Sequence, residues 1–297
     1  MRFPAYIREF VAAWRDYRAD PNTLIGQRYL IQDVIGEGSY GITYLALDQL
    51  EHRPVVLKQA RPSKGALSGQ LLEQEARILQ SLNHPRLPVF KEWITNKRHS
   101  FLVMSLVEGS TLEDLIFEQG QRFGEADSAQ ITLQLLELIG YIHQQGFVHL
   151  DLRMPNILLQ EGQLSLIDFG LARAMGEPPL SLLEVKSFRG SIGSSPYVTR
   201  LQSPAEPQSD LVDVGHFMLF LLYSAFESSR SATNAKDLSW QEELPLSHSL
   251  IEIIERLLQL RQPFADALEA AKAMRVFLSQ AAERPFSFMS NNEYNRM

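Results

Sequence analysis

The chain has 297 residues, of which 45% are hydrophobic, and this is enough apolar material for one large domain or two small domains with a buried core. Its formal net charge of -7 argues against DNA or RNA as a partner, because nucleic-acid binding depends on Lys and Arg side chains that neutralise phosphates. The chain contains no cysteine, which excludes disulfides, thiolate zinc sites and thiol catalysis.

Residues 1–26 are predicted to form an amphipathic helical extension, because large apolar side chains recur there at spacings of four and three. This stripe could pack on the rest of the chain, mediate self-association or partner docking, or lie on a membrane surface, and nearby acidic residues weaken the membrane alternative. The start lacks a small-residue cleavage site, and the longest apolar run, residues 217–226, is well short of the roughly 20 residues that span a bilayer. We therefore expect a cytoplasmic protein without a transmembrane segment. The stripe consists of Phe3, Ile7, Phe10, Trp14 and Tyr17.

Residues 27–106 contain five short runs rich in β-branched and aromatic residues, separated by turns that contain Gly or Pro. This pattern is typical of an antiparallel sheet. One helix, expected from about Gly69 to Leu82, follows the third run. The runs read YLIQDVIG, YGITYLAL, PVVLKQ, WIT and SFLVMSLV.

Residues 107–280 change to the apolar spacing of helices, so the second part of the chain is predicted to be mainly α-helical. Residues 281–297 are expected to form a flexible tail. Two strand-like pieces lie between the helices, GFVHLDLRMPNILLQ and QLSLIDFGLA, and their apolar residues flank Asp151 and Asp168. We expect the chemistry of the protein there.

The segment Gly36-Glu37-Gly38-Ser39-Tyr40-Gly41 joins two of the predicted strands. A hairpin with this spacing of glycines can fold over ATP phosphates with its backbone amides, whereas a Rossmann fingerprint requires a following helix. Gly-rich hairpin turns are also common without that role, so the motif alone is weak.

Lys58 ends the third predicted strand, and Glu75 lies in the following helix. A Lys that emerges from a sheet can hold nucleotide phosphates, and a helix carboxylate can fix its position. Taken without their neighbours, the two residues would more simply be a solvated strand residue and an exposed helix residue.

Asp151 and Asn156 lie in the segment HLDLRMPN, and Asp168 begins the triplet Asp-Phe-Gly. A carboxylate can orient an attacking hydroxyl, and hard oxygen ligands suit Mg²⁺. Asp is also frequent in turns and caps, so each residue alone proves little. However, all these motifs occur together, in an order and at spacings that are compatible with one site, and chance does not account for this combination.

In combination the motifs resemble those of the Hanks-type protein kinases, and the match covers about residues 29–278. GEGSYGITYLA is similar to the glycine-rich loop of that family, VVLK to its V-A-I-K, and EARILQSLNHPRL to its regulatory helix C and the following loop. The resemblance implies an α+β, bilobal fold, with a five-stranded antiparallel N-lobe that carries helix C and a mainly α-helical C-lobe. The lobes would be residues 27–106 and 107–280.

The resemblance also implies a role for each matching residue. Asp151 would be the catalytic base, Asn156 and Asp168 the ligands of Mg²⁺ or Mn²⁺, and Lys58 the anchor of the α- and β-phosphates, paired with Glu75. Arg153 stands where Ser/Thr kinases have a Lys near the γ-phosphate, and Asp210 matches an Asp that holds the catalytic loop. The other residues expected to contact ATP are Ile35, Gly36, Glu37, Gly38, Ser39, Tyr40, Gly41, Thr43, Val56, Met104, Ser105, Val107 and Leu158.

The implied function is transfer of the ATP γ-phosphoryl group to Ser or Thr hydroxyls of proteins, itself included. Two alternatives stay open: a pseudokinase that serves as an ATP-binding scaffold, and a small-molecule kinase of the aminoglycoside or choline kinase type. Candidate autophosphorylation sites in the activation segment are Ser181, Ser187, Ser191, Ser194 and Ser195.

Three positions depart from the family pattern. Leu150 replaces the Arg of H-R-D, so control by loop phosphorylation is less expected. The family's A-P-E reads Thr199-Arg200-Leu201, and the usual Arg partner of its Glu is Gln262. Replacing both members of a buried ion pair can be neutral, whereas losing one costs about 3–5 kcal/mol. We therefore expect a rewired C-lobe with altered substrate docking.

Overall fold

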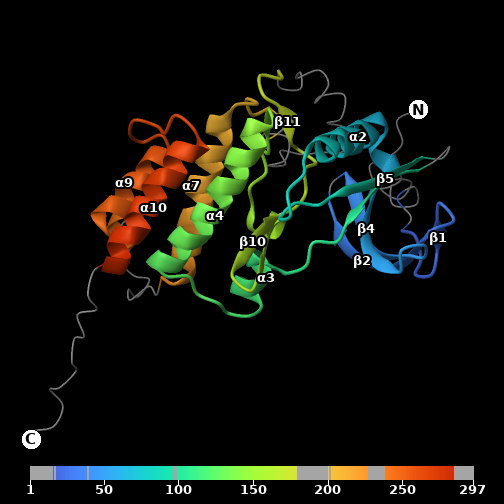
Figure 1. The fold of residues 1–297 in the computed structure, drawn as a ribbon, viewed down its shortest axis with the longest axis horizontal. Helices are drawn as coiled ribbons and strands as arrows, with labels where there is room; N and C mark the ends of the chain where they lie inside the picture. Colours follow the sequence, from blue (N-terminus) through green and yellow to red (C-terminus); the bar gives the residue numbers. More distant parts are fainter. Residues whose placement is uncertain are drawn as a thin grey trace, which may run out of the picture.

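The computed structural model describes residues 16, 18–38, 40–95, 99–178, 200, 202–226 and 238–283. The sheet and α2 lie at one end of the molecule, and the helices α4, α7, α9 and α10 lie at the other (Figure 1). This arrangement confirms the predicted α+β, bilobal fold. The apolar stripe of residues 3–17, the candidate serines of residues 181–195, Ser39 and most of the predicted tail lie outside the described residues.

The N-lobe is built on one antiparallel sheet with the strand order β1-β2-β3-β4-β6-β5. It contains a sixth strand beyond the five predicted, because Leu24 and Ile25 pair with Leu30 and Tyr29. A two-residue strand is too short to show alternation in the sequence. The strands are β1 (Leu24–Ile25), β2 (Tyr29–Glu37), β3 (Gly41–Asp48), β4 (Arg53–Ala60), β5 (Phe90–Thr95) and β6 (Ser100–Ser105).

Helix α2 (Ala66–Ser81) packs against strands β4, β5 and β6. Leu71, Leu72, Ile78 and Leu79 on α2 are buried, and the two pairs are seven positions apart, as expected for one helix face. Glu75 lies on this same face, although it is a carboxylate, and the helix thereby carries it to Lys58 on β4. The helix begins three residues before the predicted start at Gly69.

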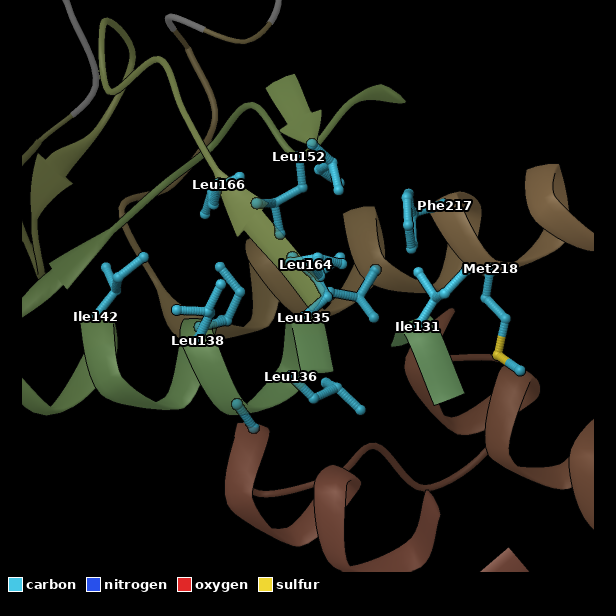
Figure 2. Close-up of a cluster of buried hydrophobic side chains, with 14 of the residues drawn as sticks. Ile131, Leu135, Leu136, Leu138, Ile142, Leu152, Leu164, Leu166, Phe217 and Met218 are labelled. Atoms are coloured by element: carbon cyan, nitrogen blue, oxygen red, sulfur yellow. The ribbon is translucent and has the colours of Figure 1, made fainter. Parts of the chain in front are cut away.

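The C-lobe is organised around α4, which packs against α7 and α10. Leu135 and Leu138 of α4, Leu164 of β10 and Met218 of α7 belong to one buried cluster, and Figure 2 shows part of it. The helices are α3 (Leu112–Phe117), α4 (Glu125–Gln144), α7 (Pro207–Ser224), α8 (Trp240–Glu243), α9 (His248–Leu257) and α10 (Ala267–Glu283). In the described part of the chain, no helix combines the length and apolar character needed to cross a membrane.

Short strands and turns place the acidic segments between the lobes. Strands β9 and β10 form a hairpin with β7 at its edge, and β8 pairs with β11. The segment with Asp151 therefore lies between β8 and β9, and Asp168 lies between β10 and β11. The elements are β7 (Ser110–Thr111), β8 (Phe147–Val148), β9 (Ile157–Gln160), β10 (Gln163–Leu166), β11 (Arg173–Ala174) and the 3₁₀ turns η1 (Pro62–Lys64) and η2 (Met154–Asn156).

Candidate active site

A cleft of about 940 Å³ lies between the lobes, and every predicted site residue in the described part of the chain lines it. The structure thus brings together residues that are up to 133 positions apart in the sequence, between Ile35 and Asp168. Ser39 lies outside the described residues. The lining residues from the prediction are Ile35, Gly36, Glu37, Gly38, Tyr40, Gly41, Thr43, Val56, Lys58, Glu75, Met104, Ser105, Val107, Asp151, Arg153, Asn156, Leu158 and Asp168.

The glycine-rich hairpin between β2 and β3 forms the upper wall of the cleft. The amide of Gly38 donates to the carbonyl of Gly41 at 2.9 Å, which closes the hairpin. The side chain of Arg61 also stabilises this turn, because its Nε donates a hydrogen bond to the carbonyl oxygen of Gly38 at 2.8 Å. The side chain of Tyr40 packs in a buried cluster with Leu67 and Leu71 of α2. Tyr40 therefore packs the hairpin against α2 and also lines the cleft.

The sheet register aligns the residues predicted to surround adenine. Val56 of β4 pairs with Met104 of β6, and Lys58 pairs with both Thr43 and Leu102. Because side chains alternate along a strand, Val56 and Lys58 face the same side of the sheet. The amide of Ser105 donates to the carbonyl of Val89 at 2.9 Å. That amide is thus engaged within the fold.

Lys58 lies between two carboxylates at the floor of the cleft. Its Nζ is 2.8 Å from Oε2 of Glu75 and 2.6 Å from Oδ1 of Asp168. Burial opposes the charged form of Lys58, but the two carboxylates outweigh it and raise the pKa of the ammonium. Lys58 is therefore a fixed positive charge in this site.

The two carboxylates around Lys58 differ in their environment. Burial raises the pKa of Glu75 to about 7, because Lys58 only partly offsets the loss of water. Burial acts in the same direction on Asp168, but the charge and hydrogen bond of Lys58 prevail and lower the pKa of Asp168. Asp168 is thus the better-ionised partner, and its side chain is 42% exposed to the cleft.

Asp168 occupies a tight turn that leaves little room for a side chain two positions later. Asp168 has φ +64°, and its Oδ1 accepts a hydrogen bond from the Gly170 amide at 3.0 Å. A Cβ at position 170 would lie 3.0 Å from that oxygen and 3.3 Å from Nζ of Lys58. Phe169 is fully buried and packs edge-on against His149, with 4.9 Å between ring centroids. The buried ring anchors the turn to the other acidic segment.

Asp151 is buried, and its carboxylate accepts three hydrogen bonds from two side chains, those of Arg153 and Asn156. Arg153 donates to it through Nε at 2.6 Å and through Nη2 at 3.0 Å, and Nδ2 of Asn156 donates to Oδ2 at 3.0 Å. Nδ2 of Asn156 also donates to the Asp151 carbonyl at 2.9 Å. These contacts fix the carboxylate at the edge of the cleft.

The backbone that carries Asp151 is held by α7. Both oxygens of the fully buried Asp210 accept hydrogen bonds, from the His149 amide at 2.9 Å and the Leu150 amide at 2.7 Å. Leu150 has φ +62°, a conformation that costs an L-residue roughly 1–2 kcal/mol. The charged acceptor on α7 therefore stabilises a strained turn just before Asp151.

The donor set suits a magnesium ion that also binds a nucleotide. Since Nδ2 of Asn156 donates to Asp151, the amide oxygen Oδ1 is the atom that can act as a ligand. Asp168 adds an exposed carboxylate. Within the described ranges, no group of three or more His, Cys, Asp or Glu residues could hold a metal. Mg²⁺ often binds one or two protein oxygens together with substrate phosphates and water, and Asn156 and Asp168 could supply these oxygens.

Arg200 lines the cleft as well, although the sequence analysis assigned it no function. Its Nη1 donates to Oδ2 of Asp213 on α7 at 2.8 Å and lies 3.4 Å from Oδ1 of Asp151. The only sequence signal was that an Arg stands where the family has the Pro of A-P-E. Its neighbours Thr199 and Leu201 lie outside the described residues.

Residues 29–264 match the family model described as the protein kinase domain. The chain is 32% identical to the probable serine/threonine-protein kinase YbdM of Bacillus subtilis over 243 residues, which is 81% of this chain and 86% of that protein. It is 34% identical to the serine/threonine-protein kinase PknL of Mycobacterium tuberculosis, where the match covers 68% of this chain and 50% of PknL. Among solved structures, the apo form of PpkA-294 matches with a TM-score of 0.65 at 21% identity, covering 86% of this chain and 99% of that one.

Proposed function

Because the chain belongs to the protein kinase domain family, we propose that it transfers the γ-phosphoryl group of ATP to Ser and Thr hydroxyls of proteins, its own included. The observation that carries the proposal is the convergence of Lys58, Asp151, Asn156 and Asp168 on one cleft. Phosphoryl transfer needs a fixed positive charge for the phosphates, oxygen ligands for a metal and a carboxylate at the attacking hydroxyl. Lys58 on β4, the segment with Asp151 and Asn156, and the turn at Asp168 could together supply these groups.

ATP would lie beneath the glycine-rich hairpin. Val56, Met104 and Leu158 provide an apolar slot for adenine, with Ile35 above it, and the backbone near Val107 can provide its polar contacts. Lys58 would bind the α- and β-phosphates, and Glu75 would keep its ammonium in place. Backbone amides of the hairpin would contact the remaining phosphate oxygens.

Asn156 and Asp168 would hold Mg²⁺ or Mn²⁺. The metal supplies charge that neutralises the phosphate oxygens and aligns them for transfer. Asp168 suits this role because its side chain lines the cleft and is partly exposed, although Oδ1 contacts Lys58. Asn156 contributes its amide oxygen and, through Nδ2, fixes the orientation of Asp151.

Asp151 would orient the hydroxyl of the substrate and accept its proton on a carboxylate oxygen. Arg153 is half exposed at the mouth of the cleft, with its guanidinium on the Asp151 carboxylate. From this position Arg153 can stabilise the negative charge of the γ-phosphate during transfer, since a guanidinium binds phosphate and carboxylate in the same planar geometry.

Protein substrates follow from this activity, and the use of ATP favours a cytoplasmic location. Self-association or partner docking through residues 1–26 stays a proposal. Asp16 and Arg18 are described and contact the N-lobe: the Ser63 amide donates to Oδ1 of Asp16 at 2.8 Å, and Arg18 forms an ion pair with Glu37. These contacts place the end of the extension beside the glycine-rich hairpin.

The proposal is tested by incubating the purified full-length chain with radiolabelled ATP, Mg²⁺ and a panel of generic protein substrates. We expect label on Ser or Thr residues, and Asp151→Asn should lower the rate by about 100- to 10,000-fold. Asp127→Asn, on the exposed first turn of α4, is the matched carboxylate control and should transfer label at the wild-type rate.

Each alternative has its own signature in this experiment. Stabilisation by ATP and Mg²⁺ without any label transfer would identify an ATP-binding scaffold instead. Label on a small alcohol with none on protein would identify a small-molecule kinase. Neither is favoured by the comparisons, whose relatives are described as protein kinases.

A further inference from the structure

Arg200 contacts three oxygens at the base of the cleft through a single nitrogen. Its Nη1 lies 2.8 Å from Oδ2 of Asp213, 3.1 Å from the carbonyl oxygen of Leu150 and 3.4 Å from Oδ1 of Asp151. The side chain is 27% exposed, so water screens these contacts only in part. Arg200 thus joins its own chain segment to the catalytic loop and to α7.

The contact with Leu150 falls on the strained turn before Asp151. Asp210 fixes the amide of Leu150 at 2.7 Å, and Arg200 fixes its carbonyl, so both polar groups of a residue with φ +62° have charged partners. Hydrogen bonds to charged groups are stronger than those between neutral groups, so these two contacts offset the cost of the conformation. Without Arg200 this turn would keep only one of its two supports.

The contact with Asp213 supports the loop from the other side. Asp213 accepts a hydrogen bond from the Leu152 amide, and burial raises its pKa while Arg200 opposes that change. Arg200 therefore favours the ionised form of Asp213, which is the better acceptor for Leu152. The three loop residues 150–152 are thereby held through one guanidinium.

Leu150 explains why a cation is needed at position 200. Its side chain is buried in a cluster with Tyr40, Val148 and Leu171, so this position of the loop provides no positive charge. The cation is instead Arg200, in the segment that precedes α7. Its acceptors are a carbonyl and two carboxylates of this chain, and none of these contacts requires a phosphate group.

We propose that Arg200 is a positioning residue for phosphoryl transfer, which holds the catalytic loop and the Asp151 carboxylate in their working geometry through direct contacts with Leu150, Asp151 and Asp213. The proposal rests on the protein kinase function above. It assigns Arg200 no contact with ATP. Its loss should therefore affect turnover and loop order, and leave nucleotide binding nearly unchanged.

The first test measures kinetics on full-length protein treated with phosphatase, so that no phosphate can replace the Arg200 contacts. We expect Arg200→Ala to lower kcat about 30- to 100-fold and to change the KM for ATP less than about threefold. Arg200→Lys keeps the charge but not the planar fork, and should recover about one tenth to one third of wild-type kcat. Arg256→Ala is the matched control, because Arg256 is 25% exposed and pairs with Glu269 in the C-lobe. Its kcat should stay within twofold of wild type.

The second test measures amide hydrogen exchange, which does not depend on turnover. In Arg200→Ala the amides of residues 150–152 should exchange at least tenfold faster than in wild type, whereas Arg256→Ala should leave them unchanged. If wild type transfers no phosphate but this difference holds, the kinase function fails and the positioning contact stands. Wild-type exchange in Arg200→Ala, or a kcat that Arg200→Lys does not recover beyond the Ala variant, overturns the proposal.

Discussion

Nζ of Lys58 lies 2.8 Å from Oε2 of Glu75, and both groups are largely withdrawn from water. The same ammonium contacts Asp168 at 2.6 Å, so one cation faces two carboxylates. The pKa of Asp168 is lowered while that of Glu75 rises to about 7, so Lys58 stabilises the ionised form of Asp168 more effectively than that of Glu75. The protonation state of Glu75 therefore changes within the working range of pH.

We expect Glu75 to make the stability of the nucleotide-free protein fall with rising pH. Its folded pKa of about 7 lies above the ordinary 4.5, so the folded state binds this proton more tightly than the unfolded state. The stabilisation is complete below pH 4.5 and is lost as the pH rises through about 7. A shift of this size corresponds to roughly 3 kcal/mol. Urea denaturation of wild type and Glu75→Gln at several pH values measures it.

The Glu75→Gln variant stays neutral at every pH and should lack this decline in the free energy of unfolding. Glu73→Gln is the matched control on the same helix, because Glu73 is half exposed and pairs with Arg77 on the surface. It should show the wild-type pH profile. Parallel profiles for wild type and Glu75→Gln between pH 4.5 and 7.5 would refute the prediction.

Removing the metal should weaken the binding of ATP. A ligand at 100 times its Kd stabilises a protein by about 2.7 kcal/mol, so saturating ATP with Mg²⁺ should raise the melting temperature by several degrees. EDTA should remove most of this increase in wild type. Asp168→Asn should have the same effect in the presence of Mg²⁺, because the amide keeps the shape but loses the charge. An unchanged ATP-dependent shift in Asp168→Asn would contradict the proposed metal role.

Much of the fold and the site could be predicted because the informative patterns lie within short segments or in the order of the motifs along the chain. Strand-like runs and helical spacing indicated a sheet in the first part of the chain and helices in the second. The motifs that resemble those of the protein kinases then implied the two lobes and the site residues that the cleft brings together. Glu75 is an instructive case, since by itself it would have been interpreted as an exposed helix residue. The resemblance implied its pairing with Lys58, and the structure places it on the buried face of α2.

The remaining features depend on geometry that a sequence pattern does not contain. Strand β1 has two residues and exists because a turn returns the chain to Tyr29 and Leu30. Tyr40 belongs to the glycine-rich motif, yet its side chain packs against α2. Arg200 was visible only as a missing Pro, and its partners Leu150 and Asp213 become neighbours only after the C-lobe has folded.

Asp210→Ala should destabilise the protein by about 2–4 kcal/mol, because it leaves the buried amides of His149 and Leu150 without acceptors. Asp210→Asn keeps one acceptor oxygen and should fall between wild type and the Ala variant. Both can be measured by urea denaturation, and kcat should fall in the same order because the loop carries Asp151. Equal stability of wild type and Asp210→Ala would show that these contacts do not hold the loop.

Two glycines in helix interiors should respond with opposite sign to the same change. Alanine is favoured over glycine in a helix by about 0.8–1 kcal/mol. A Cβ at Gly69 of α2 meets nothing within 4 Å, so Gly69→Ala should raise the free energy of unfolding by about 0.5–1 kcal/mol. A Cβ at Gly215 of α7 would lie 2.8 Å from Cδ2 of Leu258 and 3.1 Å from Cβ of Leu257.

Those contacts lie where α7 packs against α9, and overpacking of this kind costs about 1–3 kcal/mol. Gly215→Ala should therefore lower the free energy of unfolding by about 1–2 kcal/mol in spite of the gain in helix propensity. Urea midpoints of the two variants give the signs directly, and each variant is the control of the other because the chemical change is the same. A stabilising Gly215→Ala would mean that Leu258 moves aside freely. The close approach of α7 to α9 would then not require glycine.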